Sequence, residues 1–179
     1  MQVPAGIAER ELISQCKKGS LKYQEMLYKH FYGFAMGIAL RYCANRDDAM
    51  EVANDGFIKI FKTIGAFQAD RPFKAWMRTV MVNTAIDRRR RDMKNNLNLG
   101  LEHAATTGAP AGIIEDLNAR DILKMMGTLP EIQRMVFNLY EIDGYRHDEI
   151  GQLLQIPPSS SRVYLTRAKN KMRKILIAS

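Results

Sequence analysis

Hydrophobic side chains recur every three or four residues along much of the chain, which is the spacing of an amphipathic α-helix. The pattern predicts a first helix over residues 9–18 that stops near Gly19. Ser20 can cap a second, longer helix because its hydroxyl can accept a backbone N–H. His30 lies in that helix and is expected to be packed in the core. The hydrophobic stripe of the second helix is Tyr23, Leu27, Phe31, Phe34, Ile38 and Tyr42.

The polar cluster at residues 45–48 predicts a third helix, because acidic side chains in a first turn complement the helix dipole. Its inner face is Val52, Ala53, Phe57, Ile60, Phe61 and Ile64. Residues 72–91 predict a fourth helix, since Pro72 suits a first turn, where its missing N–H has no partner. The side chains expected to pack inward in the fourth helix are Phe73, Trp76, Met77, Val80 and Thr84.

The helical period disappears at Asn95, and residues 95–118 are predicted to be a flexible linker. The expected domains are therefore residues 1–94 and residues 119–179. The second domain should contain a short helix closed by Gly127 and another that begins at Pro130. The inner face of the helix after Pro130 is Ile132, Met135, Val136, Leu139 and Tyr140. The predicted fold class is all-α, with two small helical domains joined by a flexible linker.

The C-terminal domain has the layout of a helix-turn-helix. A short helix over residues 147–154 is followed by a tight turn and by a longer helix that starts at Pro158 or Ser159 and runs to about Ile177. Two-helix corners also occur in proteins that never touch nucleic acid, so a DNA-binding and a structural role are both open at this point. The outward side chains near the start of the last helix are Ser160, Arg162, Val163, Thr166 and Arg167.

Charge and composition narrow the class of protein. The net charge is +8, and the basic excess lies in residues 1–91 and 121–179, whereas residues 92–120 are slightly acidic. Two basic bodies suggest a polyanion held at two places. The two cysteines are too few for a disulfide framework and have no metal-ligand spacing. With no signal-peptide pattern and no apolar run of membrane-spanning length, we expect a soluble, cytoplasmic protein without metal or cofactor.

Enzymatic chemistry is not indicated, because the sequence has no glycine-rich phosphate loop, HExxH pair or nucleophile elbow. The first domain instead carries side-chain types that can hold single-stranded nucleic acid, although Trp76 lies on the inward face and burial in the core is the alternative role for it. Aromatic faces stack on unpaired bases, cations follow the backbone, and an amide can hydrogen-bond a base edge. The residues of these types are Lys59, Phe67, Trp76, Arg78 and Asn83.

Short strings of residues along both domains occur in a specific order. In the first domain they are Ala39 to Tyr42, Asp48-Ala49 through Gly56 to Phe61, Phe73 to Met77, and Val82 to Ala85 with the following Asp87 and arginines. In the second they are Leu129-Pro130, Arg134 to Phe137, Asp143 to Tyr145, Glu149 to Gly151, and Leu165 to Lys169. In these strings the chain resembles the extracytoplasmic-function (ECF) sigma factors, group IV of the sigma-70 family. The resemblance covers nearly the whole chain.

The resemblance implies a non-enzymatic RNA polymerase sigma factor that directs core polymerase to specific promoters and assists promoter opening. It implies three partners: core RNA polymerase, through the β′ clamp helices and the β flap, promoter DNA, and an anti-sigma factor. No direct insertion into a membrane is expected. The residues implied for core binding are Asp48, Glu51, Asn54, Asp55 and Ile58. Many members have Gln-Glu where this chain has Asn54-Asp55.

The resemblance also assigns two promoter contacts. A base flipped out of the minus-ten element would be received by stacking and by hydrogen bonds to its edge. The residues implied there are Lys59, Phe67, Gln68, Asp70, Arg71, Trp76, Arg78 and Asn83. The helix-turn-helix would grip the minus-thirty-five element through Ser160, Arg162, Val163, Thr166 and Arg167. Two rival classes are a dimeric regulator that binds duplex DNA, and an enzyme that acts on RNA or nucleotides, which the missing site residues disfavour.

Overall fold

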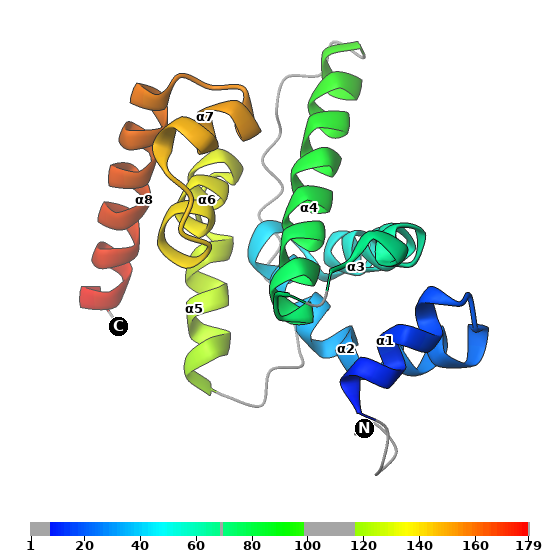
Figure 1. The fold of residues 1–179 in the computed structure, drawn as a ribbon. Coiled ribbons are helices and arrows are strands. Elements are labelled where there is room, and N and C mark those ends of the chain that lie inside the picture. Colours follow the sequence, from blue (N-terminus) through cyan, green and yellow to red (C-terminus); the bar gives the residue numbers. More distant parts are fainter. Residues whose placement is uncertain (1–7, 69, 99–116, 179) are drawn as a thin grey trace. The chain divides into compact units, whose positions relative to one another are not determined.

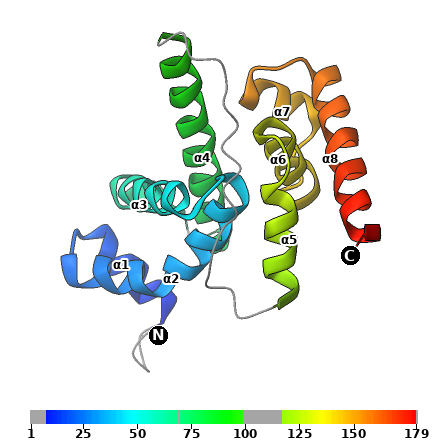
Figure 2. The same cartoon turned by 180° about the vertical axis from the view of Figure 1, so that it is seen from behind.

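The structure is a computed structural model that describes residues 8–68, 70–98 and 117–178. These residues form helices and turns and no strand, which confirms the all-α fold class (Figure 1). The N-terminal elements are α1 (Glu9–Lys17), α2 (Leu21–Tyr42), α3 (Arg46–Thr63), the 3-10 turn η1 (Ile64–Ala66) and α4 (Phe73–Asn98). The C-terminal elements, seen from behind in Figure 2, are α5 (Leu117–Gly127), α6 (Glu131–Phe137), the π-helical turn η2 (Asn138–Ile142), α7 (His147–Leu154) and α8 (Pro158–Ala178).

The chain divides into two compact units. One is Met1–Ala39 with Met50–Thr84, and the other is Leu40–Ala49 with Ala85–Ser179. The divisions fall inside α2, α3 and α4, so each of these helices contributes to both units. Within the described ranges, every helix is too short or too polar to cross a membrane.

Local signals in the sequence set most helix starts and ends. The chain leaves α1 at Gly19, whose φ of +78° is a conformation that glycine adopts without steric cost. At the start of α3, the Asp48 backbone N–H donates to Asn45 Oδ1 at 2.8 Å, which satisfies a donor that the helix leaves unpaired. At the start of α7 the hydrogen bond runs the other way: the backbone N–H of Arg146, before the helix, donates to the Glu149 carboxylate in its first turn at 2.7 Å.

The end of α4 differs from the sequence expectation. The hydrophobic pattern predicted an end at Arg91, but the helix continues to Asn98. Residues 92–98 lack a hydrophobic period, yet they contain neither glycine nor proline, so no residue interrupts the backbone hydrogen bonds. Most of the predicted linker, residues 99–116, lies outside the described residues.

The core of the first unit is built from aromatic and aliphatic side chains of all four N-terminal helices. Full burial of a large apolar side chain stabilises the fold by about 1.5–3 kcal/mol. At Gly56 of α3, an added Cβ would lie 2.8 Å from Met81 Cε of α4, so the glycine leaves room for the buried thioether. His30 is exposed, so its predicted core packing is wrong. The large buried side chains include Leu12, Leu27, Phe31, Phe57, Ile60, Phe73 and Met77.

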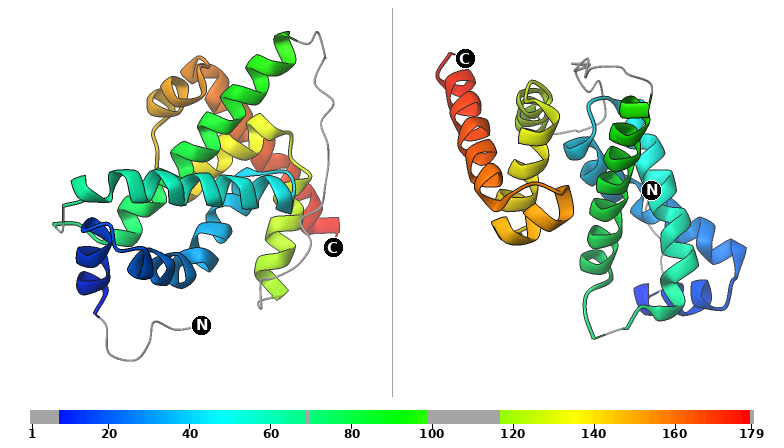
Figure 3. Two further views of the ribbon diagram at one scale, coloured as in Figure 1. Left: turned by 90° about the vertical axis from the view of Figure 1, so that its right-hand side faces the viewer. Right: turned by 90° about the horizontal axis from the view of Figure 1, so that it is seen from above.

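In the second unit, α8 packs against both α6 and α7 (Figure 3). The predicted inner residues Met135, Val136 and Leu139 are buried, but Tyr140 is 39% exposed. Tyr140 lies within the π-helical turn, whose wider i→i+5 repeat moves its side chains out of the α-helical register from which the prediction was made.

The turn between α7 and α8 depends on two backbone features. Gln155 adopts the left-handed conformation at φ 56°, which reverses the chain after α7. The following backbone then lies close to Gly151, where an added Cβ would be 2.8 Å from the Ile156 carbonyl oxygen. Glycine at this position therefore permits the tight angle between the two helices.

Candidate nucleic-acid interface

An aromatic cluster lies at the start of α4. The Phe67 ring centroid is 5.3 Å from those of both Phe73 and Trp76, and the Phe73 and Trp76 centroids are 5.5 Å apart. Phe67 is 4% exposed and Phe73 2%, whereas Trp76 is half-buried. Such tilted and edge-on pairs add to the stability that burial provides. The cluster therefore fixes the indole from one side and leaves part of it at the surface.

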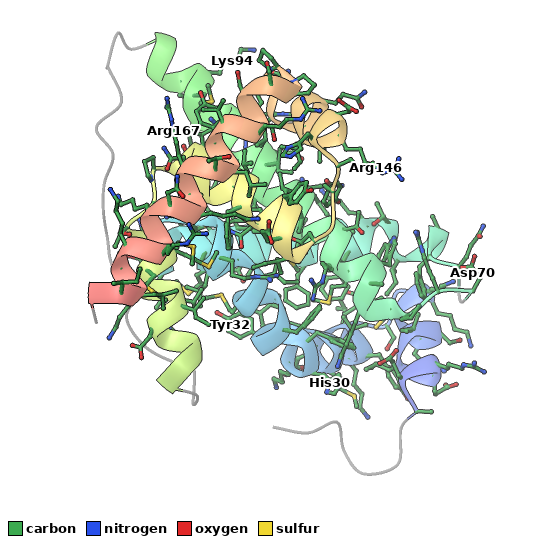
Figure 4. All side chains as sticks on the ribbon, turned by 90° about the vertical axis from the view of Figure 1, so that its left-hand side faces the viewer. His30, Tyr32, Asp70, Lys94, Arg146 and Arg167 are labelled. Atoms are coloured by element: carbon green, nitrogen blue, oxygen red, sulfur yellow. The ribbon has the colours of Figure 1, made fainter. Side chains whose placement is uncertain are left out.

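The other residues predicted to contact the minus-ten element come from α3, from α4 and from the segment between η1 and α4. Gln68, Asp70 and Arg71 are exposed and lie in the segment between η1 and α4; Figure 4 labels Asp70 there. Asn83 is exposed on α4, and Lys59 of α3 is half-buried. Most of these polar side chains are therefore at the surface, whereas the Phe67 ring is buried.

Two cations of α4 lie over an aromatic ring of α2. Lys74 Nζ is 5.9 Å from the Phe34 ring centroid, and Arg78 Cζ is 6.0 Å from it. A cation at this distance is attracted by the electrons of the ring face. The sequence pattern had assigned Phe34 to the core stripe, and its half-buried ring holds both cations at the surface.

A mixed polar and apolar stripe runs along α3. Glu51 and Asn54 are exposed, and Ile58 is 51% exposed, although a large aliphatic side chain normally favours the core. Asn54 Oδ1 accepts a hydrogen bond from Tyr28 Oη at 3.0 Å. Met50, 40% exposed, extends this stripe and was missed from the sequence, although it precedes Asn54 by one helical turn.

Asp48 and Asp55 differ from the other predicted core-binding residues. Both are half-buried. Arg88 Nη2 donates to Asp48 Oδ1 at 2.7 Å, and Asn45 Nδ2 donates to its other oxygen at 2.9 Å. Asp48 therefore joins the start of α3 to α4, a contact within the protein that the sequence strings did not reveal.

The helix-turn-helix presents a basic exposed face on α8. Arg162, Thr166 and Arg167 are exposed on the N-terminal half of α8, where Figure 4 labels Arg167. Val163 lies among them and is 46% exposed. Ser160 is half-buried. An exposed face with arginine, threonine and a small apolar side chain can donate to base edges and contact a thymine methyl group in a major groove.

A contact between the two helices lies beneath that face. Ser161 is fully buried, and its Oγ lies 2.9 Å from His147 Nδ1. The His147 ring stacks on Tyr140 at 4.5 Å between centroids. Burial and the nearby Arg162 charge lower the pKa of His147. Sequence reasoning treated His147 as a turn or first-turn residue and did not find this contact.

The described residues hold no obvious site for other chemistry. Among them, no cluster of three or more His, Cys, Asp or Glu residues is placed to hold a metal ion. Burial raises the pKa of the Cys16 thiol to about 11 and that of Cys43 to about 12. Both thiols therefore stay protonated near neutral pH, and a protonated thiol is a poor nucleophile.

Two family models match the chain, with sigma-70 region 2 over residues 27–95 and sigma-70 region 4 over residues 119–172. The RNA polymerase sigma-H factor of Pseudomonas aeruginosa is 22% identical over 94% of this chain and 93% of its own length. The ECF RNA polymerase sigma-E factor of Escherichia coli strain K12 is 24% identical over 95% of this chain and 97% of its own length.

Solved structures share the fold. The sigma factor RpoE from Bartonella quintana, in complex with the anti-sigma factor NepR, gives a TM-score of 0.56 at 18% identity, over 86% of this chain and 94% of RpoE. CnrH in complex with the cytosolic domain of CnrY gives 0.50 at 24% identity, over 97% of this chain and 99% of CnrH. The two regions match in the order that the sequence strings indicated, and the chain therefore belongs to the sigma-70 family, as a sigma factor of the ECF type.

Proposed function

We propose that this sigma factor directs core RNA polymerase to promoters. It would bind two DNA elements and assist the separation of the two promoter strands. The observation that carries the proposal is that one chain presents two different kinds of nucleic-acid surface. The start of α4 combines a half-buried indole with exposed polar side chains, whereas α8 presents a basic face on a helix-turn-helix. The first suits unpaired bases, and the second suits a duplex groove.

At the minus-ten element, a base that leaves the stack needs a new stacking partner and new hydrogen bonds. Trp76 supplies part of an aromatic surface, and the Asn83 amide can both donate to and accept from a base edge. Lys59, Arg71 and Arg78 supply positive charge for the displaced backbone. We assign Phe67 to the support of this surface, because its ring is buried and packs on the ring of Trp76.

At the minus-thirty-five element, α8 would enter the major groove with its N-terminal half. Arg162 and Arg167 can each grip a guanine with two hydrogen bonds, and Ser160 is near enough to the helix start to hold a phosphate. The buried Ser161 and its contact with His147 keep α8 at a fixed angle to α7. This contact supports a rigid reading face.

The polymerase would bind the exposed stripe of α3. Met50 and Ile58 provide apolar contact area there, and Glu51 and Asn54 provide polar contacts around it. The protein would have no catalytic activity of its own and would act in the cytoplasm, where polymerase supplies the chemistry. The complexes of the RpoE and CnrH neighbours support an anti-sigma factor as a further partner.

The deciding experiment compares purified full-length protein with and without core RNA polymerase on a library of genomic fragments. A sigma factor should bind core polymerase and produce transcripts that start at discrete sites. A dimeric regulator should instead bind a duplex operator alone and need another initiation factor. Failure to associate with core polymerase would overturn the proposal.

A further inference from the structure

Lys17, the last residue of α1, contacts the segment that leads to the base-receiving surface. Its Nζ donates to the Phe67 carbonyl oxygen at 2.6 Å and lies 5.8 Å from the centroid of the Phe67 ring. Lys17 precedes residues 27–95, over which the region 2 model matches. The two residues are 50 positions apart in the sequence, so neither the matched region nor the hydrophobic pattern reveals the contact.

Phe67 is the residue through which this contact would act. It follows η1 directly, and Gln68, the first residue of the exposed polar segment, comes next. Its buried ring packs on Phe73 and Trp76, both 5.3 Å away between centroids. A hydrogen bond that holds the Phe67 backbone in place therefore fixes both the position of Gln68 and the position of the Trp76 indole.

The helix α1, which carries Lys17, is held in place by its own packing. It packs against η1, and its Leu12, Ile13 and Cys16 side chains are buried. Lys17, by contrast, is exposed, so its removal exposes no buried apolar surface. A single exposed charge contributes little to global stability. The effect of Lys17 should accordingly fall on the local geometry at Phe67 and not on the fold.

We propose that Lys17 is a positioning residue for recognition of the minus-ten element: it holds the Phe67 carbonyl, so that the position of the adjacent Gln68 and of the Trp76 indole is set before an unpaired base arrives. This rests on the proposed function. A hydrogen bond from a charged donor is stronger than a neutral one. A preformed surface binds its base more selectively because less ordering is required when the base arrives.

The test replaces the charged donor and keeps the aliphatic stem. Lys17→Met removes the hydrogen bond and the charge, and Lys18→Met is the matched control, since Lys18 is the adjacent exposed lysine at the C-cap of α1. Full-length variants are combined with core polymerase on promoters that differ at single minus-ten positions. Opening is measured by permanganate reactivity of unpaired thymines, and binding to core polymerase is measured separately.

Lys17→Met should reduce discrimination between preferred and disfavoured minus-ten bases by about three- to tenfold, as expected for a lost charged hydrogen bond at a partly exposed site. Lys18→Met should change it less than about twofold, and Lys17→Arg should restore it because arginine keeps a charged donor. Core binding, upstream-element discrimination and melting temperature should match the wild type.

Three results would overturn the positioning role. One is unchanged minus-ten discrimination in Lys17→Met, and another is the same loss in Lys18→Met, which would indicate a general charge effect. The third is a lowered melting temperature with equal loss at both promoter elements, which would indicate a folding role. If wild-type protein itself gives no opening with core polymerase, the proposed function fails, and the inference fails with it.

Discussion

Asn83 shows how one residue can be fixed by its neighbours and still face outward. The residues on either side of it, Val82 and Thr84, are 1% exposed, whereas the Asn83 side chain is exposed. Its backbone position is therefore set by the core, and its amide is available to a base edge. An amide that is held in place before binding loses little entropy when it makes the contact.

We expect Asn83→Ala to impair promoter opening more than polymerase binding. A neutral hydrogen bond contributes about 0.5–1.5 kcal/mol, so opening should fall by up to about tenfold. The control is Thr79→Ala on the same helix, since Thr79 is also exposed and its hydroxyl already donates to the Ala75 carbonyl. Opening and core binding would be measured on the same promoter, and equal loss of both would count against a base contact.

Arg162 makes a separate prediction at the upstream element. If it grips a guanine with two hydrogen bonds, Arg162→Ala should reduce discrimination for one base pair by about 1–3 kcal/mol. Arg173→Ala removes the same charge from the far part of α8 and should weaken binding to all sequences about equally. Binding of the holoenzyme to single-substituted promoters measures both effects. Unchanged discrimination in Arg162→Ala would mean that the reading face lies elsewhere.

Between helices, the contact of His147 in α7 with Ser161 in α8 makes the helix-turn-helix sensitive to acid. The charged groups that shift His147 are Arg162, which lowers its pKa, and Asp148, which raises it, while burial is the largest cause and lowers it. The folded domain therefore binds a proton less readily than the unfolded chain. Stability gained from the neutral ring is present above the unfolded pKa of about 6.5 and is lost as pH falls toward the lower folded value.

We expect the free energy of unfolding to fall as pH is lowered from about 7 to 5.5, and His147→Gln should flatten this part of the dependence because glutamine does not titrate. Urea unfolding of the full-length protein at several pH values measures the difference between the two proteins. Parallel pH profiles for wild type and variant would show that another group controls acid sensitivity.

At the scale of the helices, some features could be predicted from the sequence and others could not. The period of hydrophobic residues located every helix, because each needs one buried face. It misplaced Tyr140, since a π-helical turn changes the period and has no simple sequence signal. It also ended α4 at Arg91, because residues 92–98 are mostly polar and give too little hydrophobic pattern to indicate a helix.

At the scale of the whole molecule, the order of short strings predicted the family, and comparison with known proteins confirmed it. Most proposed contact residues could be placed on outer faces from spacing alone, as Arg162 and Asn83 illustrate. Contacts between distant segments could not be predicted in this way. Two examples are the hydrogen bonds from Lys17 to Phe67 and from Arg88 to Asp48. Both depend on tertiary packing, which the spacing of residues along one helix does not encode.

The close approach of α3 and α4 at Gly56 has a mechanical consequence. The thioether of Met81 fills the space that a side chain on Gly56 would take, so the two helices meet through a tight, solvent-excluded joint. A densely packed contact is hardly compressible, so a displacement of one helix is passed on to the other. If polymerase binds the outer stripe of α3, that binding also fixes the orientation of α4. The enzyme would then orient the surface proposed for strand opening, on α4, through its contact with α3.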